Sequence, residues 1–273
     1  MSFALSQPDV QTPGGGNGLS PGAGAVVGSK DSWLPPTLVA LGAILVYLTS
    51  LANGFAYDDV SVVLENPAVH DLTNSLRIWF TPYWPGAAAR PAGLYRPLTI
   101  FLFAVQWSVG GGAPLIFHLL NVVLHALASV LVFYLIRTLV EWRSALGAAL
   151  LFAVHPVHVE AVANIVGQAE LVSSCLVLSA LLVYLRRPLA GEVTSWRRWL
   201  IATCFLFSLF AKEHAIVLPG LLLILDAAQG RLRRPGYVRS VARLGFLLAG
   251  ITCVYFVLRS LVLGGSLSGE VTF

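Results

Sequence analysis

Two adjacent acidic residues, Asp58 and Asp59, lie in the segment NGFAYDDVSVVLENP. They follow an apolar run that Asn53-Gly54 ends, since Asn and Gly commonly terminate helices. Adjacent carboxylates repel one another, and a carboxylate held beside a water-poor cleft is a good general base. The pair therefore predicts proton-transfer chemistry. The alternative is a solvated turn in which Asp59 caps a helix that begins at Val60.

Further polar and aromatic residues follow in the same segment. Glu65 could bind a substrate or a metal, or it could simply be solvated at a helix end, because the proline of Glu65-Asn66-Pro67 disfavours a continuing helix. An aromatic cluster comes next, which belongs either to a membrane-interface belt or to a surface that stacks on a sugar ring. Its members are Trp79, Phe80, Tyr83 and Trp84.

Cations suited to a phosphate group are the next candidates. Arg96 precedes a proline that starts a helix, where its guanidinium could extend to the membrane surface or hold a lipid phosphate with two hydrogen bonds. The nearby acidic pair favours the phosphate. Lys212 could form a local ion pair with Glu213 or neutralise a phosphate leaving group.

Histidines form two groups. His118, Asn121 and His125 recur at spacings of three and four, which places them on one helix face that must point away from lipid. His155 and His158 lie with Glu160 in HPVHVEAV, but this string lacks the HExxH arrangement of a zinc site. A divalent metal is possible, and we assign no metal ligands.

The composition decides what positions these residues. Hydrophobic residues make up 57% and charged residues 11% of the 273 residues, with a mean hydropathy of +0.79, which excludes an ordinary water-soluble domain. The basic residues form no stripe interleaved with aromatics, so a nucleic-acid partner is not expected. The three cysteines fall in apolar segments without a CxxC spacing, which excludes a disulfide framework.

The apolar residues come in blocks that predict an all-α, polytopic transmembrane helical bundle of about seven transmembrane helices, with a long first outer loop over residues 53–97. An apolar stretch at 97–109 is too short to span and predicts an interfacial helix. Residues 1–32 predict a disordered cytoplasmic tail without a cleavable signal peptide, and 33–264 form the membrane domain. The predicted spans are 34–52, 114–139, 144–154, 171–185, 199–210, 215–227 and 244–262.

The distribution of Lys and Arg predicts the orientation. With the N-terminus in the cytoplasm, twelve of the 17 basic residues lie inside, as the positive-inside rule requires. The outer loop then faces the periplasm or the lumen, in a bacterial inner membrane or an endoplasmic reticulum membrane. Residues 265–273 follow the last span without a closing element, and we expect a truncated C-terminal end there.

Seven strings, taken in order, resemble the membrane half of the transmembrane and tetratricopeptide-repeat protein family, GT-C glycosyltransferases related to protein O-mannosyltransferases. The strings are FAYDD with a later ENP, YRPL, FHLLNVVLH, FAVHPVHVEAV, GQAEL, AKEHA and YFVLRSLVLGG, over about residues 53–264. The resemblance implies a GT-C fold and an inverting transferase. The enzyme would move a sugar, commonly mannose, from a polyprenyl-phosphate carrier to a hydroxyl of a protein acceptor, expected to be Ser or Thr, on the outer membrane face.

By position, the resemblance assigns Asp58 as the base and Asp59 as a residue that orients acceptor or donor. The donor phosphate would be bound by Arg96, Lys212 and Arg259. The predicted substrate-binding residues are Glu65, His118, His155, His158, Glu160, Glu170 and Glu213.

Two departures from the family bear on activity. Gln168 stands in Gly-Gln-Ala-Glu where the family often has Gly-Arg-Ala-Glu, and the tetratricopeptide repeats are absent from the sequence. A non-catalytic binding or assembly protein is therefore an alternative. A transporter that relays protons through His118, His125, His155 and Glu160 is another, although the outer charges cluster at one membrane face and no inverted repeat is evident.

Overall fold

The structure, a computed structural model, describes residues 33–84, 93–186 and 192–264. Every regular element in these ranges is a helix, so the prediction of an all-α protein is confirmed for them. The predicted tail over 1–32 and the predicted end over 265–273 lie outside the described residues.

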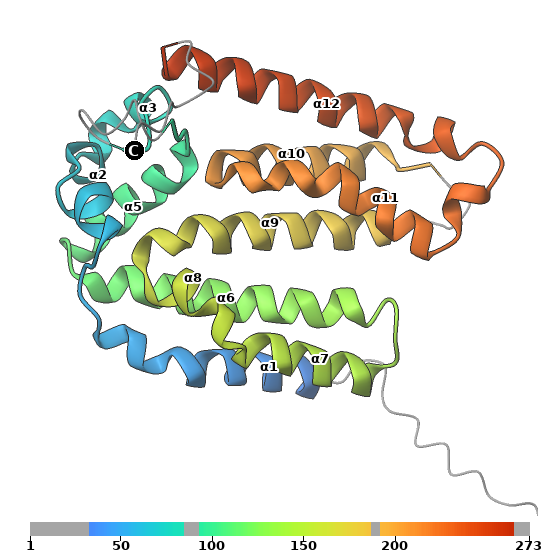
Figure 1. Cartoon of the computed structure of the whole chain (residues 1–273), viewed down its shortest axis with the longest axis horizontal. Coiled ribbons are helices and arrows are strands. Elements are labelled where there is room, and N and C mark those ends of the chain that lie inside the picture. Colours follow the sequence, from blue (N-terminus) through green and yellow to red (C-terminus); the bar gives the residue numbers. More distant parts are fainter. Residues whose placement is uncertain (1–32, 85–92, 187–191, 265–273) are drawn as a thin grey trace, which may run out of the picture. The chain divides into compact units, whose positions relative to one another are not determined.

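Seven helices lie side by side and form the bundle (Figure 1). α6 packs against α1, α7 and α9, while α9 packs against α10 and α11, and α10 packs against α12. The seven are α1 (Leu34–Tyr47), α6 (Pro114–Ile136), α7 (Trp142–Val154), α9 (Gln168–Leu185), α10 (Ser195–Ala211), α11 (Leu218–Ala228) and α12 (Tyr237–Val262).

Short helices gather at one end of this bundle, which we call the loop end (Figure 1). α5 (Pro97–Gly110) contacts α2, α3, α6 and α10 there and so links the first loop to the bundle. Gly111 ends α5 in a left-handed conformation with φ of 59°, which Gly adopts without strain. The short elements of the first loop are η1 (Leu48–Ala52), the π-helical turn η2 (Val60–Leu64), α2 (Pro67–His70), η3 (Leu72–Asn74) and α3 (Ser75–Ile78).

The chain between α7 and α9 is broken by Pro156. His155, the residue before this proline, has an extended backbone, and the flanking helices bend by 45°. The break produces three short elements at the loop end, which carry the HPVHVEAV segment. They are η5 (Pro156–His158), α8 (Val159–Ala163) and η6 (Ile165–Gly167).

The count of seven crossings is not confirmed. Four helical segments of the described residues are long and apolar enough to cross a membrane, or five if the bent pair around Pro156 is one span. α10 and α11 are 17 and 11 residues long, and a helix of 17 residues extends only about 26 Å. The structure is nevertheless that of a multi-pass membrane protein. The four segments are Leu34–Ala52, Pro114–Ile136, Ile165–Leu185 and Tyr237–Val262.

The polar face of α6 points into the bundle, as its spacing predicted. His118, Asn121 and His125 are at most 1% exposed. The Asn121 side-chain amide donates to the carbonyl of Asn164 at 2.8 Å, and His125 Nε2 lies 2.9 Å from the carbonyl of Ala153. α6 thus satisfies backbone groups that the break at Pro156 leaves without a helical partner.

The end of the bundle opposite the loop end carries most of the described arginines, and we call it the arginine end. Its turns follow α6, α9 and α11, and η8 (Arg231–Arg233) lies in the last of them. Arg231 there is 3% exposed and contacts the buried Asp226 at 3.8 Å, whereas Arg233 and Arg234 are exposed. The segregation of charge predicted from the sequence thus corresponds to two opposite ends of one helical bundle.

If the bundle crosses a membrane, its two ends face opposite compartments. We expect an impermeant maleimide to label Arg77→Cys, at the loop end, and Arg234→Cys, at the arginine end, from opposite sides of sealed vesicles. Both positions are exposed, and the exposed Cys253 would first be replaced by alanine. Labelling of both positions from the same side would contradict the arrangement.

Candidate active site

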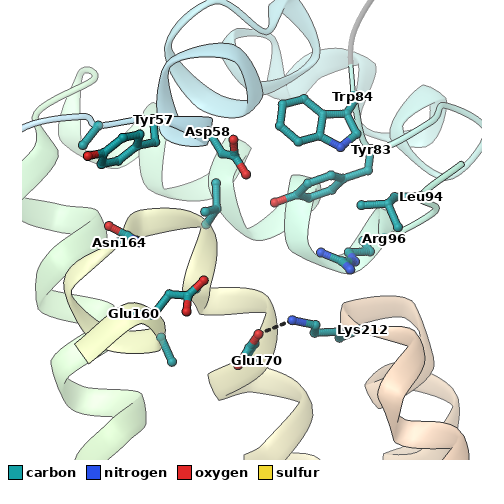
Figure 2. Close-up of a pocket in the computed structure, with 14 residues that line it drawn as sticks. Tyr57, Asp58, Tyr83, Trp84, Leu94, Arg96, Glu160, Asn164, Glu170 and Lys212 are labelled. Atoms are coloured by element: carbon teal, nitrogen blue, oxygen red, sulfur yellow. Dashed lines mark hydrogen bonds and ion pairs between the residues drawn. The ribbon is translucent and has the colours of Figure 1, made fainter. Parts of the chain in front are cut away.

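A cavity of about 370 Å³ lies at the loop end, within the size range of small-molecule sites. Residues from five separate stretches of the chain line it (Figure 2). Its charged lining residues are Asp58, Arg96, Glu160, Glu170 and Lys212. Five residues predicted separately from the sequence therefore meet in one site.

The two adjacent aspartates have different environments. Asp58 lines the cavity and is exposed, whereas Asp59 is completely buried and does not line it. Asp59 accepts a hydrogen bond from the Val166 N–H at 2.9 Å and one from the Ala56 N–H at 3.2 Å. It makes no side-chain cap to η2, so the alternative of a helix cap is wrong. Asp59 joins the first loop to η6 and thereby places Asp58 at the cavity.

The wall opposite the first loop depends on a close backbone approach at Gly167. A Cβ atom there would lie 2.3 Å from the Ala161 carbonyl oxygen, a distance that no side chain tolerates. Glycine therefore lets η6 fold tightly against α8. Asn121 holds the Asn164 carbonyl from the other side. These contacts fix α8 and the first turn of α9, which carry Glu160 and Glu170.

Arg96 is positioned by Glu213, at the start of η7 (Glu213–Val217). Its Nη2 and Nε donate to the two carboxylate oxygens at 2.6 and 3.0 Å, and the guanidinium lies 5.1 Å from the centre of the Tyr83 ring. Burial alone would raise the pKa of Glu213, but the hydrogen bonds and charge of Arg96 outweigh burial and lower that pKa. Both groups are therefore charged at neutral pH.

Lys212 pairs with Glu170 at one wall of the cavity (Figure 2). The side chain of Lys212 is 11% exposed and that of Glu170 is 50% exposed. The alternative that Lys212 pairs with its neighbour Glu213 is wrong, because these two residues have separate partners on different elements. Lys212 and Arg96 thus present two positive charges to the same cavity.

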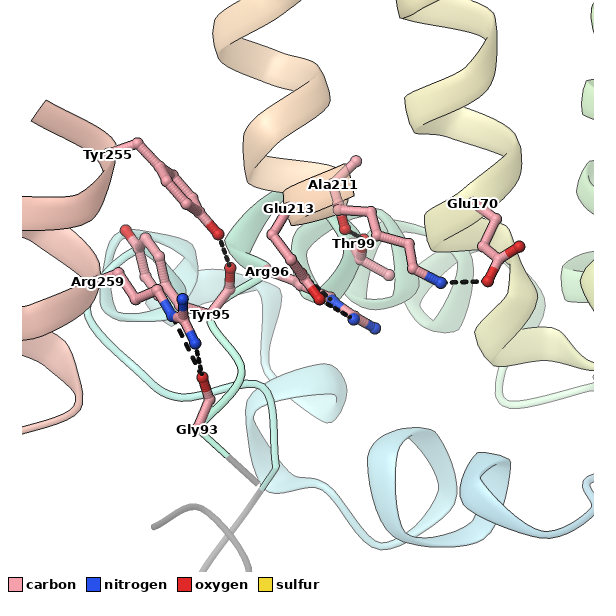
Figure 3. A network of polar contacts seen from close by, with 10 residues as sticks. Gly93, Tyr95, Arg96, Thr99, Glu170, Ala211, Glu213, Tyr255 and Arg259 are labelled. Atoms are coloured by element: carbon pink, nitrogen blue, oxygen red, sulfur yellow. Dashed lines mark hydrogen bonds and ion pairs between the residues drawn. The ribbon is translucent and has the colours of Figure 1, made fainter. Parts of the chain in front are cut away.

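The segment from Gly93 to the first turn of α5 is held to the bundle by further polar contacts (Figure 3). Thr99 donates a hydrogen bond to the Ala211 carbonyl at 3.0 Å, and the Tyr255 hydroxyl donates to the Tyr95 carbonyl at 3.3 Å. Arg259 donates to the Gly93 carbonyl, with Nη2 at 2.8 Å, and does not line the cavity. Arg259 holds the chain that carries Arg96, and its assignment to the phosphate stays a prediction.

Aromatic side chains complete the cavity walls. Tyr83 and Trp84 line the side that carries Arg96, so part of the predicted aromatic cluster reaches the site. Burial raises the pKa of the Tyr83 hydroxyl, which therefore stays protonated. Tyr57 lines the cavity with 89% of its surface exposed and has a φ of 50°, a strained value for a non-glycine residue.

Sequence reasoning missed Tyr57 and Asn164. No sequence pattern predicts a positive φ at a tyrosine. The backbone of Tyr57 is instead imposed by a turn that Asp59 closes. Asn164 lines the cavity between α8 and η6, where its position depends on the contact with Asn121. Both residues are brought to the cavity by contacts between segments that are distant in the sequence.

The remaining predicted site residues lie outside the cavity lining. Glu65 is exposed at the end of η2, His118 is completely buried, and His155 is exposed with its Nδ1 accepting from the Val157 N–H at 3.1 Å. His158 packs against Phe152 and His125. In the part of the chain that the structure describes, no three His, Cys, Asp or Glu residues are close enough to hold a metal ion.

Gln168, the departure from the family pattern, is completely buried. Its side chain is not among those that line the cavity, although Gly167 before it and Glu170 two residues after it are. The substitution therefore changes the interior of the first turn of α9 and leaves the two cavity cations unchanged.

Comparisons with known proteins find similar sequences among protein O-mannosyl-transferases. Protein O-mannosyl-transferase TMTC3 of Mus musculus is 36% identical over 200 residues, which are 71% of this chain and 22% of the relative. TMTC3 of Homo sapiens is 34% identical with the same coverage, and Tmtc1 of Drosophila melanogaster is 42% identical over 182 residues, 64% of this chain and 20% of that protein. No family model matches. No solved structure matches.

The chain is thus a multi-pass helical membrane protein with a charged cavity at one end of its bundle. It resembles the membrane half of the transmembrane and tetratricopeptide-repeat family, and the curated relatives confirm the resemblance that the seven strings predicted. The chain spans about a fifth of the length of the relatives it matches.

The different roles of the two aspartates predict different effects on stability. Asp59→Asn replaces one hydrogen-bond acceptor of a buried carboxylate by a donor, and we expect it to lower the free energy of unfolding by about 1.5–3 kcal/mol. Asp58→Asn is the matched control and should leave the thermal midpoint in detergent unchanged. Equal midpoints for both variants would contradict the structural role of Asp59.

The ion pair of Arg96 predicts an acid-sensitive contribution to stability. Because the pKa of Glu213 is lowered from 4.5, the pair stabilises the fold above pH 4.5, and this contribution is lost as the pH falls through the lowered pKa. Glu213→Gln should therefore cost about 1–2 kcal/mol near neutral pH, and the difference should vanish in acid.

The control for this pair is Glu192→Gln. Glu192 and Arg243 are 3.8 Å apart with both side chains more than half exposed, so the substitution should have little effect at any pH. Thermal midpoints recorded against pH would separate the two variants. If the thermal midpoint of Glu213→Gln stayed below that of the wild-type chain by the same amount in acid, the ionised carboxylate of Glu213 would not be the source of the lost stability.

Proposed function

We propose that the chain is the membrane domain of an inverting GT-C glycosyltransferase. It would transfer a sugar, mannose, from a polyprenyl-phosphate carrier to a Ser or Thr hydroxyl of a protein acceptor. The observation that supports this most directly is one cavity that presents the free carboxylate of Asp58 together with the cations of Arg96 and Lys212. The names of the relatives, protein O-mannosyl-transferases, support the sugar and the protein acceptor.

In the proposed reaction, Asp58 takes the proton of the acceptor hydroxyl as its oxygen attacks the anomeric carbon of the sugar. The bond between that carbon and the phosphate oxygen breaks, and its electron pair leaves with the polyprenyl phosphate. Lys212 and Arg96 stabilise the negative charge that develops on the leaving phosphate. Attack from the side opposite the phosphate inverts the configuration of the carbon.

The same proposal includes the topology. The loop end would face the periplasm or the lumen, and the arginine end the cytoplasm, because basic turns are retained on the cytoplasmic side. The polyprenyl chain of the donor would lie along the apolar bundle, while the acceptor would reach the cavity from the aqueous side. Arg259, Glu65 and the histidines of the loop end remain proposed substrate contacts.

Transfer of labelled mannose from a polyprenyl-phosphate donor in proteoliposomes tests this function. Asp58→Asn should lower kcat by at least about 100-fold, within the range of general base catalysis, without changing the thermal midpoint. Lys212→Met should lower kcat and weaken donor binding, because a cation at the phosphate is lost. Glu141→Gln, an exposed carboxylate at the start of α7, is the control and should retain full activity.

Unchanged turnover in Asp58→Asn would overturn the assignment of the base. A folded wild-type chain that binds the donor and transfers nothing would favour the non-catalytic binding or assembly protein. Donor binding and transfer are therefore measured on the same preparation.

A further inference from the structure

The charges of the cavity are incompletely balanced. Lys212 is neutralised by Glu170, and Arg96 is neutralised by Glu213 behind the wall. The other two cavity carboxylates, Asp58 and Glu160, form no ion pair with any described residue. With Asp58 assigned to proton transfer, Glu160 is the negative charge in the site that has no described counterpart.

Glu160 lies on the α8 wall of the cavity, with Glu170 between it and Lys212. Figure 2 shows it with Asn164 and Tyr57 on one side, and Arg96 with Lys212 on the other. Its side chain comes from α8 and is exposed, so a ligand can reach it without a rearrangement of the bundle.

The reaction geometry assigns this side to the acceptor, in an argument that rests on the proposed function. The donor phosphate binds at Arg96 and Lys212, and inversion requires the hydroxyl to attack from the opposite side of the anomeric carbon. The acceptor must therefore pass between Asp58 and the wall formed by Glu160, Asn164 and Tyr57. An uncompensated carboxylate on that path attracts a positive charge and repels a negative one.

We propose that Glu160 selects protein acceptors that carry a lysine or arginine beside the hydroxyl to be modified. The exposed ring of Tyr57 supports the same choice, since an aromatic face attracts a cation and its apolar stem. Asn164 supplies an uncharged polar group to the acceptor backbone. The base, Asp58, is thereby left to the hydroxyl, and the acceptor is oriented by its neighbouring positive charge.

A competing use of Glu160 is to bind hydroxyls of the sugar, which carboxylates and amides also do. The two uses differ in their dependence on charge. The amide introduced by Glu160→Gln would still bind sugar hydroxyls, but it would not distinguish a basic acceptor from a neutral one. This substitution therefore separates the two uses, and Glu160→Lys reverses the charge.

The experiment compares three short Ser peptides that are identical except for Lys, Gln or Glu beside the serine. In proteoliposomes with the polyprenyl-phosphate mannose donor, the wild-type chain should prefer the Lys peptide to the Gln peptide by about two- to fivefold in kcat/KM, the size expected for one exposed charge pair. The Glu peptide should be the poorest. Glu160→Gln should remove the preference, Glu160→Lys should reverse it, and KM for the donor should stay constant.

Controls keep this test separate from that of the function. Glu141→Gln should retain the wild-type preference, and thermal midpoints of both Glu160 variants show whether they fold. Peptide affinity is also measured without the donor, so that the preference can be seen even if no sugar is transferred. A preference in binding without any transfer would overturn the proposed function and leave the role of Glu160 intact. Equal use and binding of the three peptides by the wild-type chain, or a preference that survives in Glu160→Gln, would overturn the role of Glu160.

Discussion

The position of the candidate base depends on one buried carboxylate. Asp59 forms no ion pair with any described residue and is instead satisfied by two backbone N–H groups, one in its own loop and one in η6. A buried carboxylate without such partners would be strongly unfavourable, so the loop and η6 must lie together. That single requirement turns Asp58 toward the cavity and imposes the strained backbone of Tyr57.

The cations of the site are positioned by a second set of buried charges. Arg96 and Lys212 are each only about a tenth exposed, and each has a carboxylate partner on another element. These partners serve two purposes, because they make burial of the cations tolerable and fix their direction before a ligand arrives. The two ion pairs differ in where the carboxylate lies relative to the cavity. Glu213 holds Arg96 from outside the cavity, whereas Glu170 holds Lys212 from within it, so a phosphate would compete directly with Glu170.

The fold could be predicted from the sequence where a residue pattern depends on a single helix. The inward polar face of α6 followed from the spacing of His118, Asn121 and His125, and the end of α7 at Val154 matches the predicted span 144–154. The number of crossings was not predictable in the same way. Apolar blocks near α10 and α11 are short, and whether such a helix spans depends on its tilt and on its neighbours, which composition does not contain.

For the site, the residue types that bear charge at the loop end could be read from the sequence, because an ionisable group beside an apolar span is costly and so marks a special position. Asp58, Arg96, Glu160 and Lys212 were recognised in this way, and Glu170 through the family resemblance. Their partners were decided only by the tertiary structure. Lys212 and Glu213 are neighbours in the chain yet bind different residues, since successive side chains point in different directions and each reaches a carboxylate or cation on another helix. The sequence by itself thus determined which groups are present at one end of a membrane bundle, while packing decided which of them face the cavity, which are neutralised, and which carboxylate is left for a substrate.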